Sequence, residues 1–333
     1  MSNQSSTTAT AGLKKGLHIN SGILQQLIAF GSLAVLVIAF SLLSSNFFTF
    51  DNIVGILLST AVIGVLALGA TFVIITGGID LSIGTVMTLT AVMTGVFITY
   101  WGLPIWVGVI GGILTGSICG FISGVVVARM NVPPFIATLA MMMVAKGLAL
   151  VISGARPIYF DIELGFNKLA LGSIIGGIPN GVVIFFLAAI IGSIILSKTV
   201  IGRYNFALGS NEEATRLSGI NVNKWKIIIY MITGTFVGLA GVLMASRLNS
   251  AQPSLGQGYE LEAIAAVVLG GTSLSGGKGT IIGTVIGALI MSVLTNGLRI
   301  LSVPQEWQTV VVGIVIVFAV YADILRRRKR SSK

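Results

Sequence analysis

Charged residues are scarce in this chain. Lysine, arginine, aspartate and glutamate make up 9% of its 333 residues, whereas hydrophobic residues make up 55% and the mean hydropathy is +1.00. Soluble globular proteins carry about 25% charged residues, so this composition excludes a sizeable soluble domain. Apolar stretches of about twenty residues, the length that crosses a bilayer core of ~30 Å, recur along almost the whole chain. The one long polar interruption between them is the segment 198–226.

The chain is also poor in residues that carry out catalysis or bind metals. Its single cysteine, Cys119, excludes an intrachain disulfide and a multi-cysteine metal site, and its single histidine, His18, stands alone near the N-terminus. The segment 274–278 (LSGGK) ends like a phosphate-binding loop. However, Thr272 stands where such a loop needs its first glycine, and Gly279 stands where it needs a hydroxyl. We therefore expect no enzymatic activity, no bound ATP, no metal and no cofactor in this chain.

Ten membrane spans are predicted from the apolar runs and from the proline, glycine and charged residues that break them. The third and eighth are rich in Thr and Gly, and a partly re-entrant segment is the alternative for both. The expected fold is therefore an all-α integral membrane protein with an N-terminal tail at 1–23, a ten-helix domain at 24–323 and a basic C-terminal tail at 324–333. The ten spans lie near residues 24–45, 53–76, 82–100, 104–128, 132–153, 179–197, 227–246, 260–274, 280–300 and 305–323.

Lysine and arginine are distributed unevenly between the two sides of this arrangement. With both termini on one side, fifteen of the twenty fall on that side and Lys146 falls within a span. Because positive loops stay in the cytoplasm, both termini are predicted to be cytoplasmic, and the net charge of +10 is a topology signal rather than a nucleic-acid surface. Glu260 and Glu262 are expected outside. The four basic residues on the outer side are Arg156, Lys168, Arg247 and Arg299.

Two glycine patterns concern how the spans pack. The fourth and ninth spans carry glycines at a spacing of four, which places them on one helical face where a neighbouring backbone can approach closely. Separately, GGIDLSIG (77–84) and GGTSLSGG (270–277) share the pattern G-G-x-x-L-S-x-G at cytoplasmic junctions between spans, which suggests an internal repeat of a helix group. The spaced glycines are Gly108, Gly112, Gly116, Gly120 and Gly124, and then Gly279, Gly283 and Gly287.

The polar segment 198–226 contains a predicted short helix. Ser210 or Asn211 can cap its start, Glu212 and Glu213 suit its N-terminus, and Gly219 can end it. In a transporter without its own energy source, such a rigid element on the cytoplasmic face is what a separate motor would contact. The candidate contact residues are Ser210, Asn211, Glu212, Glu213, Ala214, Thr215, Arg216, Leu217, Ser218 and Gly219.

Polar side chains inside the spans are the candidates for a translocation path. The hydroxyls of Ser82, Thr85 and Thr88 and the amide of Asn296 suit a neutral polyol. The alternative for each hydroxyl is a hydrogen bond to a carbonyl of its own helix. Lys146, the one clearly internal ionisable residue, can line the path, snorkel outward or pair with a carbonyl. The spans lack the carboxylates that proton and sodium couplers use at membrane depth, which argues against an ion-driven pump.

Four stretches of the chain resemble the ribose-type sugar permeases of ATP-binding-cassette (ABC) transporters, and the resemblance runs from about Phe47 over nearly the whole remaining chain. It implies a bacterial inner-membrane subunit that forms the path for ribose or a related monosaccharide. The implied partners are a second permease copy, a cytoplasmic ATPase that binds ATP and Mg, and an extracytoplasmic sugar-binding protein. The four stretches are GGIDLSIG at 77–84, PPFIATLAMM at 133–142, GRYNFALGSNEEATRLSGINVNKWKIIIY at 202–230 and SAQPSLGQGYELEAIAAVVLGGTSLSGGKGTIIGT at 250–284.

The resemblance also implies roles for particular residues. It places the ATPase contact at 210–219, although Thr215 replaces the last alanine of the permease pattern E-A-A-x-x-x-G and no Leu-Pro follows. It places the contact with the binding protein on the outer loops, where the candidates are Asp51, Arg156, Asp161, Glu163, Arg247, Gln252 and Tyr259.

The sequence leaves two alternatives open. One is a permease of the same type for another small polar solute, such as an amino acid, a nucleoside or autoinducer-2, although an acidic substrate would need more cations along the path than Lys146. The other is a self-contained facilitator or channel, which would transport without any ATPase. Whether the permease pairs with itself or with a paralogue is also open.

Overall fold

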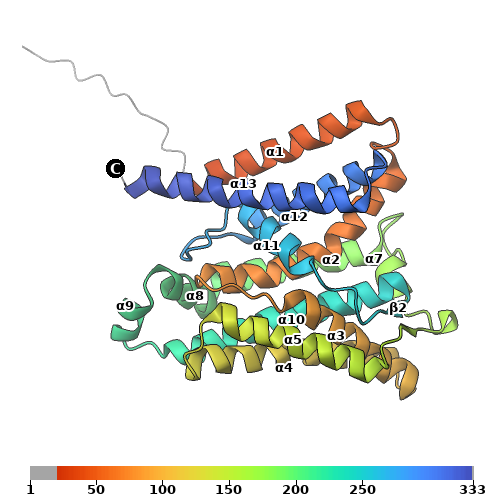
Figure 1. Ribbon diagram of the computed structural model, residues 1–333, viewed down its shortest axis with the longest axis horizontal. Helices are drawn as coiled ribbons and strands as arrows, with labels where there is room; N and C mark the ends of the chain where they lie inside the picture. The colour runs from red at the N-terminus through yellow and green to blue at the C-terminus, as the bar shows by residue number, and fades with distance from the viewer. Residues whose placement is uncertain (1–20, 332–333) are drawn as a thin grey trace, which may run out of the picture.

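The computed structural model describes residues 21–331, and these are almost entirely helical. Within that range nine helices are long and apolar enough to cross a membrane, and they form one bundle along a common axis (Figure 1). The prediction of an all-α integral membrane protein is therefore confirmed. The long helices are α1 (Ser21–Leu43), α2 (Phe50–Ile75), α3 (Ile83–Gly95, extended by the π-helical turn Val96–Tyr100), α4 (Ile105–Arg129), α5 (Pro134–Ser153), α7 (Asn180–Lys198), α10 (Val222–Leu248), α12 (Ile281–Ile300) and α13 (Gln305–Ser331).

The predicted tails contribute little to this description. Residues 1–20, which make up most of the N-terminal tail, lie outside the described residues, as do Ser332, Lys333 and the side chains of 326–331 in the basic tail.

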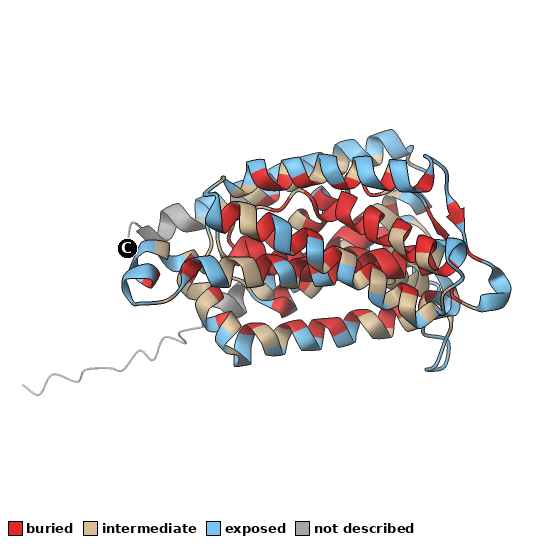
Figure 2. Ribbon diagram, turned by 90° about the horizontal axis from the view of Figure 1, so that it is seen from below, coloured by how far each residue is buried: buried red, intermediate tan, exposed pale blue. Residues whose placement is uncertain are grey.

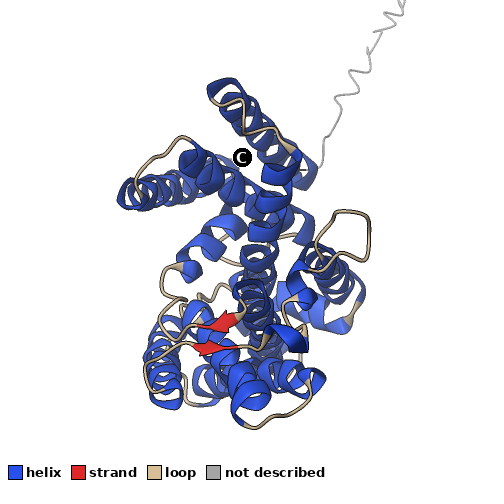
Figure 3. Cartoon of the chain, turned by 90° about the vertical axis from the view of Figure 1, so that its right-hand side faces the viewer, coloured by secondary structure: helices blue, strands red, loops and turns tan. Residues whose placement is uncertain are grey.

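The two ends of the bundle carry different short elements. At one end, which we call the α9 end, lie α8 (Val200–Ser210) and α9 (Glu212–Leu217). At the other, which we call the ribbon end, β1 (Ile158–Tyr159) pairs antiparallel with β2 (Ser250–Ala251). Figure 3 shows these strands from that end. The remaining short elements are a 3-10 turn (Ile162–Leu164), α6 (Lys168–Leu171) and α11 (Tyr259–Leu269).

The eighth predicted span, 260–274, does not form a full membrane helix. Its helical part is α11, which has 11 residues and a length of roughly 16 Å, about half of a bilayer core. The chain nevertheless passes from one end of the bundle to the other, because β2 lies at the ribbon end and the amide of Gly277 donates to the carbonyl of Ile75 at the α9 end. Turns at 253–258 and an irregular loop at 270–280 complete the passage. Nine long helices and this broken segment give ten passages, the even number that the predicted topology requires.

Helix α10 runs through the centre of the bundle, and its closest neighbour is α4. A Cβ atom at Gly116 would collide with the carbonyl oxygen of Gly234, and one at Gly120 would collide with that of Tyr230. In the ninth predicted span, a Cβ atom at Gly287 would collide in the same way with the carbonyl of Ala266 on α11. Both predicted glycine seams are therefore confirmed as surfaces of close backbone contact.

The core lies around α2, α3 and α10, and the outer helices have one exposed face each. Figure 2 shows the buried residues concentrated along the middle of the bundle. Leucine, isoleucine and phenylalanine side chains remain exposed on α1, α4, α5, α7 and α13. In a membrane protein this apolar outer surface is the surface that contacts lipid.

Candidate coupling and translocation sites

Helix α9 matches the helix predicted within 198–226. Asn211 lies at its N-cap in an extended conformation, and its side-chain oxygen accepts a 2.9 Å hydrogen bond from the amide of Ala214. Gly219, two residues beyond the helix, has a positive φ of 80°, which glycine adopts without strain. The predicted helix is confirmed, with Asn211 rather than Ser210 as the cap.

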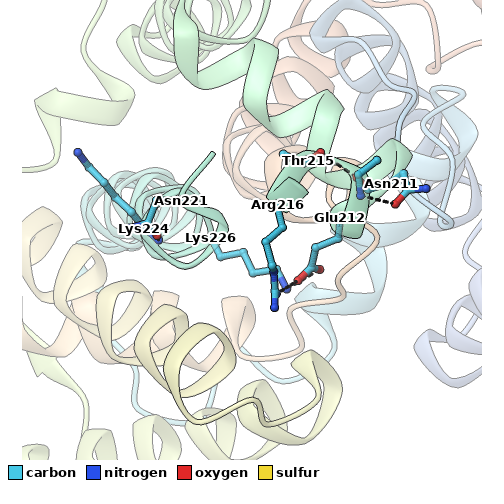
Figure 4. Close-up of polar contacts among 8 residues, drawn as sticks. Asn211, Glu212, Thr215, Arg216, Asn221, Lys224 and Lys226 are labelled. Carbon is cyan, nitrogen blue, oxygen red and sulfur yellow. Dashed lines mark hydrogen bonds and ion pairs between the residues drawn. The ribbon is translucent and has the colours of Figure 1, made fainter. Parts of the chain in front are cut away.

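One ion pair attaches α9 to the bundle, and two further contacts stabilise α9 itself (Figure 4). Glu212 pairs with Arg216 at 3.4 Å and with Lys226, in the first turns of α10, at 2.6 Å. Thr215 is buried, and its hydroxyl donates to the carbonyl of Asn211 at 2.8 Å. The other residues of α9 and the one that follows it are exposed; they are Glu213, Ala214, Arg216, Leu217 and Ser218.

Directly before α9, three segments meet at Gly209. A Cβ atom there would collide with the carbonyl of Ile75 and the amide of Gly277, which are hydrogen-bonded to each other at 2.8 Å. Gly276 and Gly77 lie at the same point, since a Cβ atom on Gly276 would come within 2.8 Å of the Gly77 nitrogen. The last turn of α8 therefore contacts both the end of α2 and the loop before α12. It is here that the two G-G-x-x-L-S-x-G segments meet, although whether they derive from a duplication stays a prediction.

The chain from α2 to α3, residues 76–82, is fixed by internal hydrogen bonds. Asp80 is buried, and its carboxylate accepts from the amide of Ser82 at 2.8 Å and from the Ser82 hydroxyl at 2.6 Å. On the neighbouring helix α5, the Thr138 hydroxyl accepts from the amide of Leu81 at 3.2 Å. The predicted path residue Ser82 thus holds Asp80 in place.

The other predicted path residues make three kinds of contact. Thr85 and Thr88 are buried and donate to carbonyls of their own segment, those of Ser82 at 3.1 Å and Gly84 at 3.3 Å. Asn296 donates to the Asn52 side chain at 2.9 Å and so joins α12 to α2. The ammonium group of Lys146 donates to the side-chain oxygen of Gln257 at 3.2 Å and so joins α5 to the segment 252–258.

The segment 252–258 and the residues after it lie deeper than the sequence analysis expected. Glu260 was expected outside but is 8% exposed and lies against Gly84, near the start of α3. Both of its carboxylate oxygens accept from the amide of Gly258 at 3.1 Å, so that it caps its own helix. The expectation that Glu260 lies in an outer loop was therefore wrong. Pro253, Gly256 and Gly258 were the available signal that this stretch is not helical.

The predicted binding-protein contacts are only partly together. Asp51, at the start of α2, is exposed, and the exposed Arg156, Asp161 and Glu163 lie in the loop that carries β1; all four are at the ribbon end. Gln252 is exposed next to β2. Arg247 and Tyr259 are half-buried instead, and the Arg247 guanidinium donates to the Ser59 hydroxyl of α2 at 3.1 Å.

Comparisons with known proteins cover most of the chain. Residues 52–320 match the profile of a family described as "Branched-chain amino acid transport system / permease component". The chain is 44% identical to the ribose import permease protein RbsC of Escherichia coli K12, over 88% of this chain and 91% of that protein. It is 44% identical to RbsC of Bacillus subtilis, over 96% and 97%. It is 37% identical to the fructose import permease protein FrcC of Rhizobium meliloti, over 87% and 83%. No solved structure matches the chain.

Proposed function

Because the chain belongs to the family of permease components of branched-chain amino acid transport systems, we propose that it is the membrane-spanning subunit of an ABC importer for a monosaccharide. The observation that carries this proposal is the 44% identity, over nearly the full length of both chains, to permeases named for ribose import. The relative named for fructose supports a monosaccharide as the substrate class. Ribose is therefore the first substrate to test, followed by xylose, allose, rhamnose, galactose-type sugars and inositol.

The proposed assembly contains three further components. A second permease copy, identical or paralogous, completes the membrane part, and an extracytoplasmic binding protein delivers the sugar to the ribbon end. A cytoplasmic ATPase binds ATP and Mg and contacts the α9 end. The exposed residues of α9, Glu213 among them, provide a surface for that contact, and the exposed Asp51, Arg156, Asp161 and Glu163 provide one for the binding protein.

In this proposal, movement of α9 reaches the bundle by two routes. The Glu212–Lys226 ion pair connects α9 to α10. The contacts of Gly209 connect α8 to the end of α2 and to the loop that precedes α12. A displacement of α9 by the ATPase thus acts on α2, α10 and α12 together, and these are helices of the buried core. This arrangement suits alternating access driven from the cytoplasmic side.

Uptake of radiolabelled sugar tests the proposal. The permease is co-expressed with the ATPase encoded beside it, reconstituted into proteoliposomes and supplied with the neighbouring binding protein and ATP. We expect uptake that requires all three. Uptake of the same sugar by the permease alone would replace the proposal with the facilitator, and uptake of amino acids or nucleosides in place of sugars would replace the substrate class.

A further inference from the structure

The chain between β2 and α11 descends to the middle of the bundle. Ala251 is paired with Ile158 at the ribbon end. Five residues later Gly256 packs against Gly84, and a Cβ atom on either glycine would collide with the other's carbonyl oxygen. At the ribbon end, Ile158 packs against Gly95 of α3. Gly84 lies 11 residues earlier in the same helix, which is roughly 16 Å of helix rise. Gly256 and its neighbours therefore lie about half a bilayer thickness below the ribbon.

A second helix gives the same depth. The ammonium group of Lys146 donates to the side-chain oxygen of Gln257 at 3.2 Å. Lys146 lies 12 residues after Pro134, the first residue of α5, or roughly 18 Å from the α9 end of that helix. Two independent helices thus place Gln257 near the centre of the membrane.

Polar side chains are exposed at this depth. Gln257 and Ser254 are exposed, whereas Gly256 and Pro253, which directly precede them, are buried. An ammonium group and an amide cannot face acyl chains without a large loss of solvation free energy. Water, a solute or another protein surface must therefore cover this face.

Helix α5 separates this polar face from lipid. Leu148 follows Lys146 by two residues, which is about 200° around the helix, and its side chain is 45% exposed among other apolar residues. The two sides of one helix, at one depth, thus differ completely in polarity.

We propose that Gln257, presented by the broken segment 252–258 and positioned by Lys146, is a sugar contact in the translocation path. This rests on the proposed function and assigns a contact residue within it. A primary amide both donates and accepts, as sugar hydroxyls do. Lys146 holds the oxygen of Gln257, and among the described residues no acceptor is bonded to its amide nitrogen. That nitrogen is free to donate to a sugar hydroxyl.

The residues beneath Gln257 keep it in position. Glu260 fixes the turn through the amide of Gly258, and the contact between Gly84 and Gly256 holds the backbone against α3. The site is therefore one polar side chain on a fixed backbone. A single neutral contact of this kind suits a path that releases its cargo readily.

Cysteine labelling tests the proposal in the complete complex. In a Cys119→Ala background, Gln257→Cys and the matched control Leu148→Cys are reconstituted with the ATPase and binding protein and treated with a charged methanethiosulfonate. We expect Gln257→Cys to react at least tenfold faster than Leu148→Cys. We also expect the sugar identified by wild-type uptake, supplied with its binding protein and ATP, to slow that reaction severalfold. Equal rates at the two positions would overturn the proposal, and so would fast labelling that the sugar leaves unchanged.

A second measurement does not depend on the cysteine variants. Gln257→Leu is expected to reduce uptake at least tenfold while ATP hydrolysis and assembly of the complex stay near wild type. Gln305→Leu, at the exposed first residue of α13, makes the same chemical change away from this segment and is expected to keep most of its uptake. If wild-type protein takes up no sugar, the proposed function itself fails. If wild type and Gln257→Leu transport equally, only the assignment of Gln257 fails.

Discussion

The main-chain amide of Gly277 donates a 2.8 Å hydrogen bond to the carbonyl of Ile75, although the two residues are about two hundred positions apart in the sequence. Gly209 packs directly on this bond. The contact joins the end of α2, the loop before α12 and the helix that leads into α9, so added volume at Gly209 disturbs three segments at once.

Gly209→Ala is expected to destabilise the protein by about 1–3 kcal/mol, because the added methyl group meets backbone atoms, which cannot move aside as a flexible side chain can. Thermal unfolding in detergent measures this change, and ATP-driven uptake should fall with it. Gly55→Ala is the control, since a Cβ atom at Gly55 of α2 meets nothing within 4 Å. Equal stability of the two variants would show that Gly209 is not a tight contact.

Glu213→Arg is expected to weaken binding of the ATPase at least tenfold without unfolding α9. Glu213 is exposed and makes no ion pair among the described residues, so the substitution changes the outer surface of α9 while the Asn211 cap and the Glu212 pairs remain. Co-purification of the ATPase with the permease measures the effect. Glu163→Arg, at the ribbon end, should leave ATPase binding unchanged.

The double change Glu213→Arg with Arg216→Glu alters the outer surface of α9 and also breaks the ion pair between Arg216 and Glu212, so it changes two features at once. If even the double variant retains both ATPase binding and uptake, α9 is not the coupling element.

Lys226→Met is expected to separate ATP hydrolysis from transport. The ion pair with Glu212 is partly solvent-exposed, so its loss should change stability by less than about 1 kcal/mol. The mechanical connection from α9 to α10 is lost nevertheless, and the number of sugars moved per ATP should fall severalfold. Lys224→Met is the matched control, since Lys224 forms no ion pair within the described residues. An unchanged ratio in Lys226→Met would show that the ion pair is dispensable and that the Gly209 contacts carry the movement of α9.

Gly234→Val is expected to separate α4 from α10. A Cβ atom at Gly234 collides with the carbonyl of Gly116, so the two backbones must move apart. Helix association in a membrane depends on such close packing because lipid supplies no hydrophobic drive. We expect a loss of about 1–3 kcal/mol in stability, measured by unfolding in mixed micelles. Gly313→Val on α13 has open space around it and should behave like wild type.

The parts of the structure that follow from local chemistry could be predicted from the sequence. The long apolar runs gave the nine long helices, the spacing of Gly116 and Gly120 gave the seam with α10, and Asn211 followed by two glutamates gave α9. Each of these depends on residues that are near one another in the chain.

The broken passage could not be predicted in the same way. The turns at 253–258 are stabilised by contact between Gly256 and Gly84, which are far apart in the sequence. The same holds for Lys146, whose partner Gln257 comes from that segment. Glu260 looked like an outer-loop residue because a carboxylate that caps its own short helix inside the bundle has no distinctive pattern.

The two-residue ribbon gives α10 a second attachment. At one end of this 27-residue helix, Lys226 forms an ion pair with α9. Just beyond the other end, Ser250 and Ala251 pair as a strand with the loop that carries Arg156 and Glu163. Helix α10 therefore links the α9 end of the bundle to the ribbon end. In the proposed importer, the binding protein at the ribbon end and the ATPase at the α9 end therefore contact segments that are joined by the same helix, so a displacement at one end is transmitted to the other.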